Sequence, residues 1–202
     1  MIRPVIDRVY VGLRRAAGSG ARALYERWGL RPGMESDYYF ALLDHPVPAG
    51  AIEEATVYGG FDPAEEAARG VVVLEEGAWR LTGEGRRLAL ELGEVIGSAS
   101  AELWSRGPVA TMPGSERLER LCDLVGRCLA AGRAGGGPAF TGVTPVFEPE
   151  GADAASILSS RLGALRHHRG DAHRAAWREA GYDVSALPAM SEGPSRRAIE
   201  EA

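Results

Sequence analysis

Three of the four histidines lie within residues 165–173, a segment that reads Leu-Arg-His-His-Arg-Gly-Asp-Ala-His. Histidine exchanges protons near neutral pH, a carboxylate can orient its ring, and arginine can hold developing negative charge. These residue types at this spacing indicate acid–base chemistry without a cofactor, such as hydrolysis, elimination, isomerisation or cyclisation. We expect His168 or His173 to act as general acid or base, Asp171 to orient it, and Arg169 to bind an anion.

A helix is expected to position this segment, because apolar residues recur at helical spacing along it. The expected buried stripe consists of Leu158, Leu162, Leu165, Ala172 and Ala176. Arg169 falls in the middle of the stripe and His168 at its edge. A buried charge requires a partner, so Arg169 predicts a buried carboxylate or an anionic ligand.

The opposite face of this helix is expected to be solvated if the helix is continuous. Its residues are His167, Asp171, Arg174 and Arg178. Gly170 could instead break the helix and turn Asp171 toward His168 or His173.

Two alternatives to catalysis remain open for the histidine segment. His168, Asp171 and His173 could bind a metal, but separations of three and two residues suit an unbroken helix poorly, so no metal is expected. A structural role explains the pattern as well as all catalytic versions together. In that case a core histidine bonds to the backbone and Arg169 bridges two helices.

The composition removes several function classes. The chain has 202 residues, a formal net charge of −5, and no lysine, asparagine or glutamine. Without lysine there is no Schiff base, pyridoxal-phosphate attachment or P-loop lysine. Without asparagine and glutamine, the side chains that read adenine through paired hydrogen bonds in the major groove are missing. Cys122 and Cys128 fit neither a zinc knuckle nor a CxxC pair. We expect no cofactor and, because no long apolar run occurs, a cytoplasmic location with no membrane contact.

Hydrophobic periodicity and turn residues predict a mainly α fold. Helices are expected at residues 2–28 with an interruption at 18–20, and at 36–45, 49–58, 62–70, 82–92, 98–105, 115–131 and 153–180. A β-hairpin is expected from residues 71–74 and 79–82, and residues 132–151 are expected to form an ordered cover.

The order of three short helices, a hairpin and a further helix is that of a winged helix-turn-helix. The expected organisation is a small β-hairpin wing on this core, with added N- and C-terminal helices, in one compact unit. Its parts are N-terminal helices at 1–32, the winged core at 33–97, a helical region carrying the histidines at 98–187, and a loosely held tail at 188–202.

Residues 70–72 and 79–86, with the sequences Gly-Val-Val and Trp-Arg-Leu-Thr-Gly-Glu-Gly-Arg, resemble the wing of MarR-like regulators. Residues 165–181 are similar to the C-terminal signature of an actinobacterial family of MarR-like helix-turn-helix proteins of largely unassigned role. Residues 29–59 are similar to its middle region, apart from the Leu-Asp-His-Pro at 43–46. The resemblance implies a winged-helix fold with a special C-terminal helix, and it supplies no reaction.

DNA binding is the usual role of such a fold, but the local charges oppose it here. The helix at 62–70, which would enter the major groove, carries three acids and one arginine, and the hairpin tip adds Glu75 and Glu76. Binding to DNA normally depends on several cations that neutralise phosphates. We therefore rank nucleic-acid binding behind a role that does not involve DNA.

Aromatic side chains could form the walls of a hydrophobic pocket beside Arg169. Those expected to bind substrate are Tyr38, Tyr39, Tyr58, Trp104 and Trp177. Our leading hypothesis is an acid–base enzyme of specialised (natural-product) metabolism that binds a small organic molecule, anionic if Arg169 contacts it. The alternative is a MarR-like, ligand-responsive transcriptional regulator that binds DNA as a dimer, and a homodimer remains open in both cases.

Overall fold

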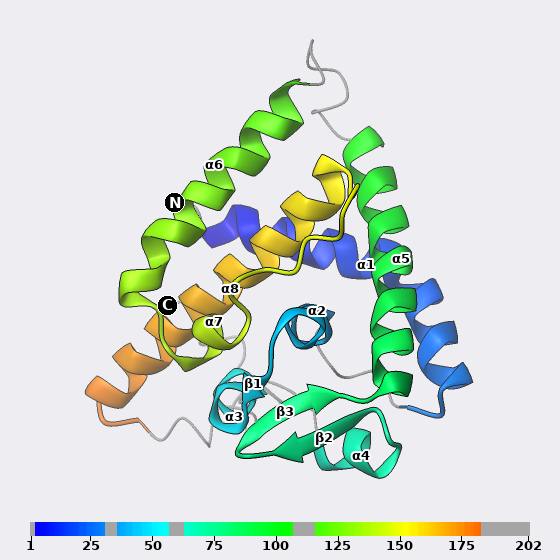
Figure 1. Cartoon of the computed structure of the whole chain (residues 1–202). Helices are drawn as coiled ribbons and strands as arrows, with labels where there is room; N and C mark the ends of the chain where they lie inside the picture. Colours follow the sequence, from blue (N-terminus) through cyan, green and yellow to red (C-terminus); the bar gives the residue numbers. More distant parts are fainter. Residues whose placement is uncertain (1–2, 31–35, 57–62, 107–115, 183–202) are drawn as a thin grey trace, which may run out of the picture.

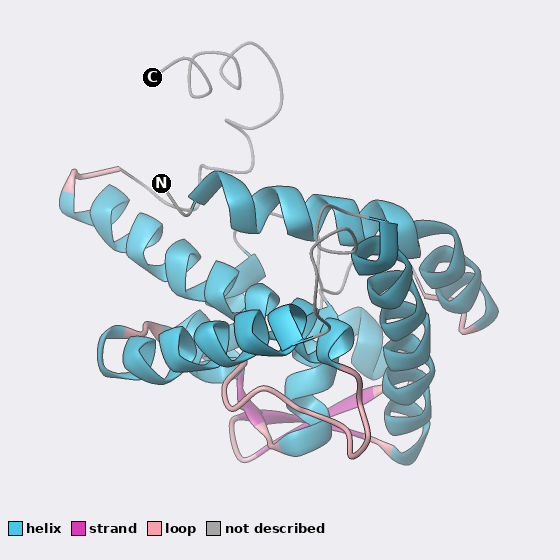
Figure 2. Cartoon of the chain, turned by 90° about the horizontal axis from the view of Figure 1, so that it is seen from above, coloured by secondary structure: helices cyan, strands magenta, loops and turns pink. Residues whose placement is uncertain are grey.

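The computed structural model describes residues 3–30, 36–56, 63–106 and 116–182, and it is mainly helical with one small sheet (Figures 1 and 2). The helices are α1 (Arg3–Arg27), α2 (Ser36–Asp44), α3 (Ala49–Thr56), α4 (Pro63–Ala68), α5 (Gly83–Arg106), α6 (Glu116–Gly132), α7 (Pro138–Gly142) and α8 (Ala154–Glu179), with a 3₁₀ turn at Arg133–Gly135. The strands are β1 (Val47–Pro48), β2 (Val72–Glu75) and β3 (Ala78–Leu81).

The three strands form an antiparallel sheet in the order β1-β3-β2. The predicted hairpin is confirmed, with Val72 opposite Leu81 and a tight turn at Glu76 and Gly77, both of which have positive φ. β1 was not predicted, because a strand of two residues that includes Pro48 is too short to show the alternation of a strand. Val47 is fully buried opposite Trp79, so a tertiary contact creates this strand.

α1 and α5 are each continuous where the sequence predicted an interruption, and they pack against each other (Figure 1). The predicted interruption of α1 at residues 18–20 is wrong, because the helix is continuous. A Cβ placed on Gly20 would lie 2.9 Å from Val95 Cγ1, so this glycine allows close packing instead of breaking the helix. α5 likewise continues through Gly93 and Gly97, and the expected boundary after residue 97 falls inside it.

α8 crosses the middle of the molecule and contacts α1, α5, α6 and α7 (Figure 1). Asp153 caps its N-terminus by accepting a hydrogen bond from the Ser156 backbone N–H at 2.7 Å. Gly181, with φ of +79°, follows its end as predicted. Residues 132–151 form an ordered cover, also as predicted, and Phe140 within it is fully buried.

Candidate functional site

The buried face of α8 follows the prediction in its N-terminal half, where Leu158 and Leu162 are buried, and departs from it in the C-terminal half. The helix is continuous through Gly170, and its buried polar residues are Ser159, His167, Asp171 and Arg174. His167 and Asp171 were expected on the solvated face, whereas Ala172 and Ala176 of the expected stripe are exposed. The prediction was wrong because the polar side chains meet partners on distant elements, which local periodicity does not reveal.

Asp171 fastens α7 to α8. Its two carboxylate oxygens accept hydrogen bonds from the backbone N–H groups of Ala139 at 3.2 Å and Phe140 at 2.8 Å, in the first turn of α7. Arg174 donates to the same carboxylate at 2.5 Å and lies 3.2 Å from a carboxylate oxygen of Glu54. A Cβ on Gly137 would lie only 2.6 Å from Asp171 Cγ, so this contact also depends on glycine. The geometry gives Asp171 a structural role.

His167 forms a buried pair with Asp37 of α2. The distance between His167 Nε2 and Asp37 Oδ2 is 3.2 Å, and the two side chains are 5% and 7% exposed. The Tyr38 ring meets the imidazole edge-on at 5.3 Å between ring centroids. A Cβ on Gly163 would lie 2.4 Å from Asp37 Oδ1. Sequence reasoning missed this pair, because the two residues are 130 positions apart.

The other predicted catalytic residues lie in separate environments. His168 is half-buried, with its ring edge-on to Phe140 at 4.9 Å. Arg169 is half-buried, and His173 is exposed and accepts a hydrogen bond from Trp177 Nε1 at 2.7 Å. None of His168, Arg169, Asp171 and His173 is among the described residues that line the apolar pocket below.

The aromatic residues expected to bind substrate mostly make core contacts. Tyr38 and Tyr39 are almost completely buried, with their hydroxyls directed to the Ala51 carbonyl and to Glu66. Trp104 and Trp177 are half-buried and donate to Ser159 and His173 respectively. Tyr58 lies outside the described residues. The four described aromatic residues do not line the pocket that follows.

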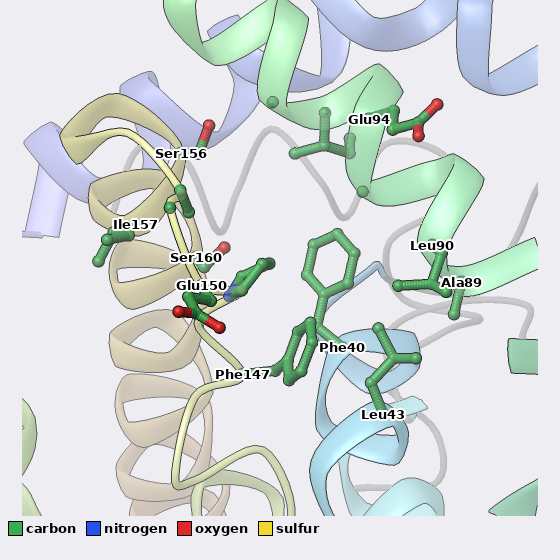
Figure 3. A pocket seen from close by; sticks show the side chains of 16 residues that line it. Phe40, Leu43, Ala89, Leu90, Glu94, Phe147, Glu150, Ser156, Ile157 and Ser160 are labelled. Carbon is green, nitrogen blue, oxygen red and sulfur yellow. The ribbon is translucent and has the colours of Figure 1, made fainter.

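An apolar pocket of about 460 Å³ lies between α2, α5, α8 and the segment at residues 143–153, which we call the strap (Figure 3). Phe40 of α2 and Phe147 of the strap lie together in it (Figure 3). The remaining apolar wall consists of Leu43, Ala89, Leu90, Gly93, Ile96, Gly97, Pro149, Gly151, Ala152 and Ile157. Its volume is in the range of sites for small organic molecules, which runs from about 300 to 1,000 Å³.

Ion pairing and capping hold the strap in place over α8. Glu148 accepts two hydrogen bonds from the Arg161 guanidinium, at 2.7 and 3.0 Å, and Arg161 also donates to the Cys122 carbonyl on α6. The hydrogen bonds to Glu148 raise the pKa of Arg161, which therefore stays charged. The strap is an ordered wall of the pocket, as its apolar composition at residues 143–147 had indicated.

The polar groups of the pocket are two carboxylates and two hydroxyls. Glu94 lies on the α5 side and Glu150 on the strap side, and both are exposed residues (Figure 3). Ser156 and Ser160 of α8 supply the hydroxyls. In the described part of the chain, Glu94 and Glu150 make no ion pair, and no arginine or histidine lines the pocket.

A second hollow of about 10 Å³ adjoins the pocket and shares Phe40, Phe147 and Ser160 with it. Asp37 lines this hollow, so the buried pair of Asp37 and His167 lies directly behind the aromatic wall of the pocket. The hollow has the volume of about one water molecule. Asp37, paired with His167, is therefore an acid–base group that borders the hollow beside the pocket.

Glu66 is also buried. It belongs to α4, the helix that would enter the major groove in a DNA-binding winged helix. Tyr39 donates to its carboxylate at 2.5 Å. Burial raises the pKa of Glu66 above its ordinary value, with the Tyr39 hydrogen bond acting in the opposite direction. Burial and the nearby carboxylate raise the pKa of Tyr39 as well. The hydrogen bond between Tyr39 and Glu66 therefore fixes α4 to the core.

The described residues contain no group of three or more histidine, cysteine, aspartate or glutamate side chains arranged to hold a metal ion. None of their helices combines the length and apolar character needed to cross a membrane.

Comparison of the chain with protein-family models, with curated proteins and with solved structures finds no significant match.

Proposed function

We propose that this protein binds a small organic molecule in the apolar pocket, on a winged-helix scaffold that is not adapted to DNA. The observation that carries the proposal is the 460 Å³ pocket itself, with Phe40 and Phe147 at its centre. Leu90 at the pocket is 44% exposed, and exposed apolar surface beside a cavity favours an apolar guest. The ordered strap supports the proposal, because it keeps the cavity formed in the absence of a ligand.

The winged-helix part of the proposal draws on the order of α2, β1, α3, α4, β2, β3 and α5. In such a scaffold α4 would be the recognition helix. α4 contains no basic residue, and Glu66 points into the core. At the wing, Arg80 lies 3.4 Å from Glu75 and is partly neutralised by it. These charges favour ligand binding without DNA binding, since phosphate contacts require unpaired cations.

Filling the pocket tests the proposal. A Cβ on Gly93 would make only an ordinary contact of 3.6 Å with Phe40 Cε1, so Gly93→Leu places a side chain in the cavity without a backbone clash. We expect at least a tenfold loss of binding of Prodan, a neutral naphthalene dye whose emission shifts in apolar sites. Stability is expected to stay equal or rise by up to about 1 kcal/mol, because leucine replaces a helical glycine.

Gly18→Leu is the matched control, because it makes the same change in α1, where a Cβ would meet no atom within 4 Å. It should bind Prodan like the unaltered protein. Equal Prodan binding by both variants, or no binding by the unaltered protein, would contradict the proposed function. A mobility-shift assay at low salt should show no complex with duplex DNA, and a tight, sequence-selective complex would favour the regulator.

Cofactor-free acid–base catalysis is a second candidate function. It is favoured by Asp37, which lines the hollow next to the pocket and whose carboxylate pairs with His167. A base there would remove an acidic proton from a bound molecule. Exchange of the α-protons of 1-indanone with deuterated water, followed by NMR, tests this. Asp37→Asn should abolish the exchange and retain Prodan binding, whereas the same slow exchange with both proteins would contradict catalysis.

A further inference from the structure

We propose that the molecule bound in the apolar pocket is an organic cation, an amine with an apolar body. This inference rests on the proposed function and adds the charge of the ligand. The charged side chains lining the pocket are Glu94 and Glu150, and both are carboxylates.

Among the residues that the structure describes, Glu148 and Asp153 near the pocket have protein partners, whereas Glu94 and Glu150 have none. Glu148 is neutralised by Arg161 through two hydrogen bonds, and Asp153 accepts from the backbone at the start of α8. Within the described residues, Glu94 and Glu150 have no ion pair or hydrogen bond. Two unpaired carboxylates therefore border an apolar cavity from two sides, one on α5 and one on the strap (Figure 3).

This arrangement is complementary to a ligand with two parts. An aromatic or aliphatic body can lie against Phe40 and Phe147, and an ammonium group on that body is attracted by the carboxylates that border the cavity on its two sides. The Ser156 and Ser160 hydroxyls can accept or donate hydrogen bonds along the α8 side. A carboxylate or phosphate ligand would meet repulsion from Glu94 and Glu150, with no basic side chain in the lining to offset it.

The sequence had suggested an anionic ligand, on the assumption that Arg169 enters the pocket. Arg169 is not one of the lining residues. The charge preference expected from the structure is therefore the reverse of the one expected from the sequence.

Three molecules that share one ring system and differ in charge test the inference. They are 1-naphthylmethylamine, 1-naphthalenemethanol and 1-naphthoate, each used to displace Prodan from the full chain. Because one partly exposed charge pair is worth about 2- to 5-fold in affinity, two carboxylates predict that the amine binds roughly tenfold more tightly than the alcohol. The naphthoate should bind most weakly. The preference for the amine should decrease at 1 M salt, where the Debye length is about 3 Å.

Substitution of the carboxylates separates charge recognition from pocket binding. In the double variant Glu94→Gln with Glu150→Gln, we expect the affinity for the amine to fall until the amine and the alcohol bind within about twofold of each other. Glu119→Gln removes a charge on the exposed side of α6, away from the pocket lining, and should leave the preference intact.

The outcomes distinguish failure of this inference from failure of the proposed function. Equal displacement by all three molecules, or strongest displacement by naphthoate, overturns the cation inference. If Gly93→Leu still abolishes Prodan binding in that case, the proposed function stands. Absence of Prodan binding to the unaltered protein overturns both.

Discussion

The two halves of α8 contribute to the molecule in opposite ways. The N-terminal half, with Ile157, Ser156 and Ser160, lines the pocket and has few groups that could do chemistry. The C-terminal half contains the histidines and charged residues, and its buried members Asp171 and Arg174 are matched by α7 and Glu54. A concentration of reactive residue types in a sequence therefore does not by itself locate a functional site. The carboxylate of Asp171 is occupied by its contacts with α7 and Arg174.

Among the substitutions that test this contrast between the two halves of α8, Asp171→Ala is expected to have the largest effect on stability. The substitution removes two hydrogen bonds to α7 and leaves Arg174, whose side chain is 3% exposed, with only Glu54 as a charge partner. Breaking a buried ion pair from one side costs about 3–5 kcal/mol, and we expect a loss of that size in the free energy of unfolding. Urea denaturation measures it. An unchanged midpoint together with lost ligand binding would move Asp171 from the scaffold to the site.

Glu66→Gln tests a buried polar group on α4 and gives a smaller effect. Because the folded-state pKa of Glu66 is raised, the folded protein binds the proton more tightly than the unfolded chain does. Its contribution to stability is therefore present at low pH and is lost as pH rises through the window above the ordinary carboxyl pKa.

Glutamine keeps an acceptor for the Tyr39 hydroxyl and cannot ionise. We expect Glu66→Gln to be more stable than the unaltered protein at pH 8, by about 1 kcal/mol, and to match it near pH 4. Urea midpoints at the two pH values measure this difference, with exposed Glu119→Gln as the control. If Glu66→Gln gained more stability at pH 4 than at pH 8, the pKa of Glu66 in the folded protein would be lowered and not raised.

The smallest effect is expected for His173→Ala. His173 is exposed, and its contact with Trp177 is on the surface. We expect a change in stability below about 0.5 kcal/mol and no change in Prodan binding. The same urea and fluorescence measurements check both. A loss of binding would restore His173 as a site residue and would weaken the contrast between the two halves of α8.

The sequence predicted the helical class, the hairpin and the start and end of α8, because each depends on local signals. Asp153 as a cap, Gly77 in a turn and Gly181 after a helix act within a few residues of their own positions. It failed at β1 and at the lengths of α1 and α5, where packing between distant elements overrides the local preference of proline and glycine.

The candidate site was harder to predict than the fold. The ordered cover that the sequence predicted at residues 132–151 includes Phe147, which lines the pocket. Nothing local to Asp37 or Glu94 reveals the elements that they face, because those contacts span α2, α5 and α8. The predicted buried face of α8 failed in the C-terminal half of the helix for the same reason, since partners for His167 and Asp171 come from α2 and α7.

Gly137 and Gly163 each lie against a buried carboxylate, at separations that leave no room for a methyl group. Any amino-acid substitution at either position would displace Asp171 or Asp37, so we expect natural selection to hold both positions as glycine throughout the lineage of this protein. Gly93 has space beside it and is free to diverge. Descendants that keep the first two glycines and vary the third would share one architecture while accepting guests of different shapes.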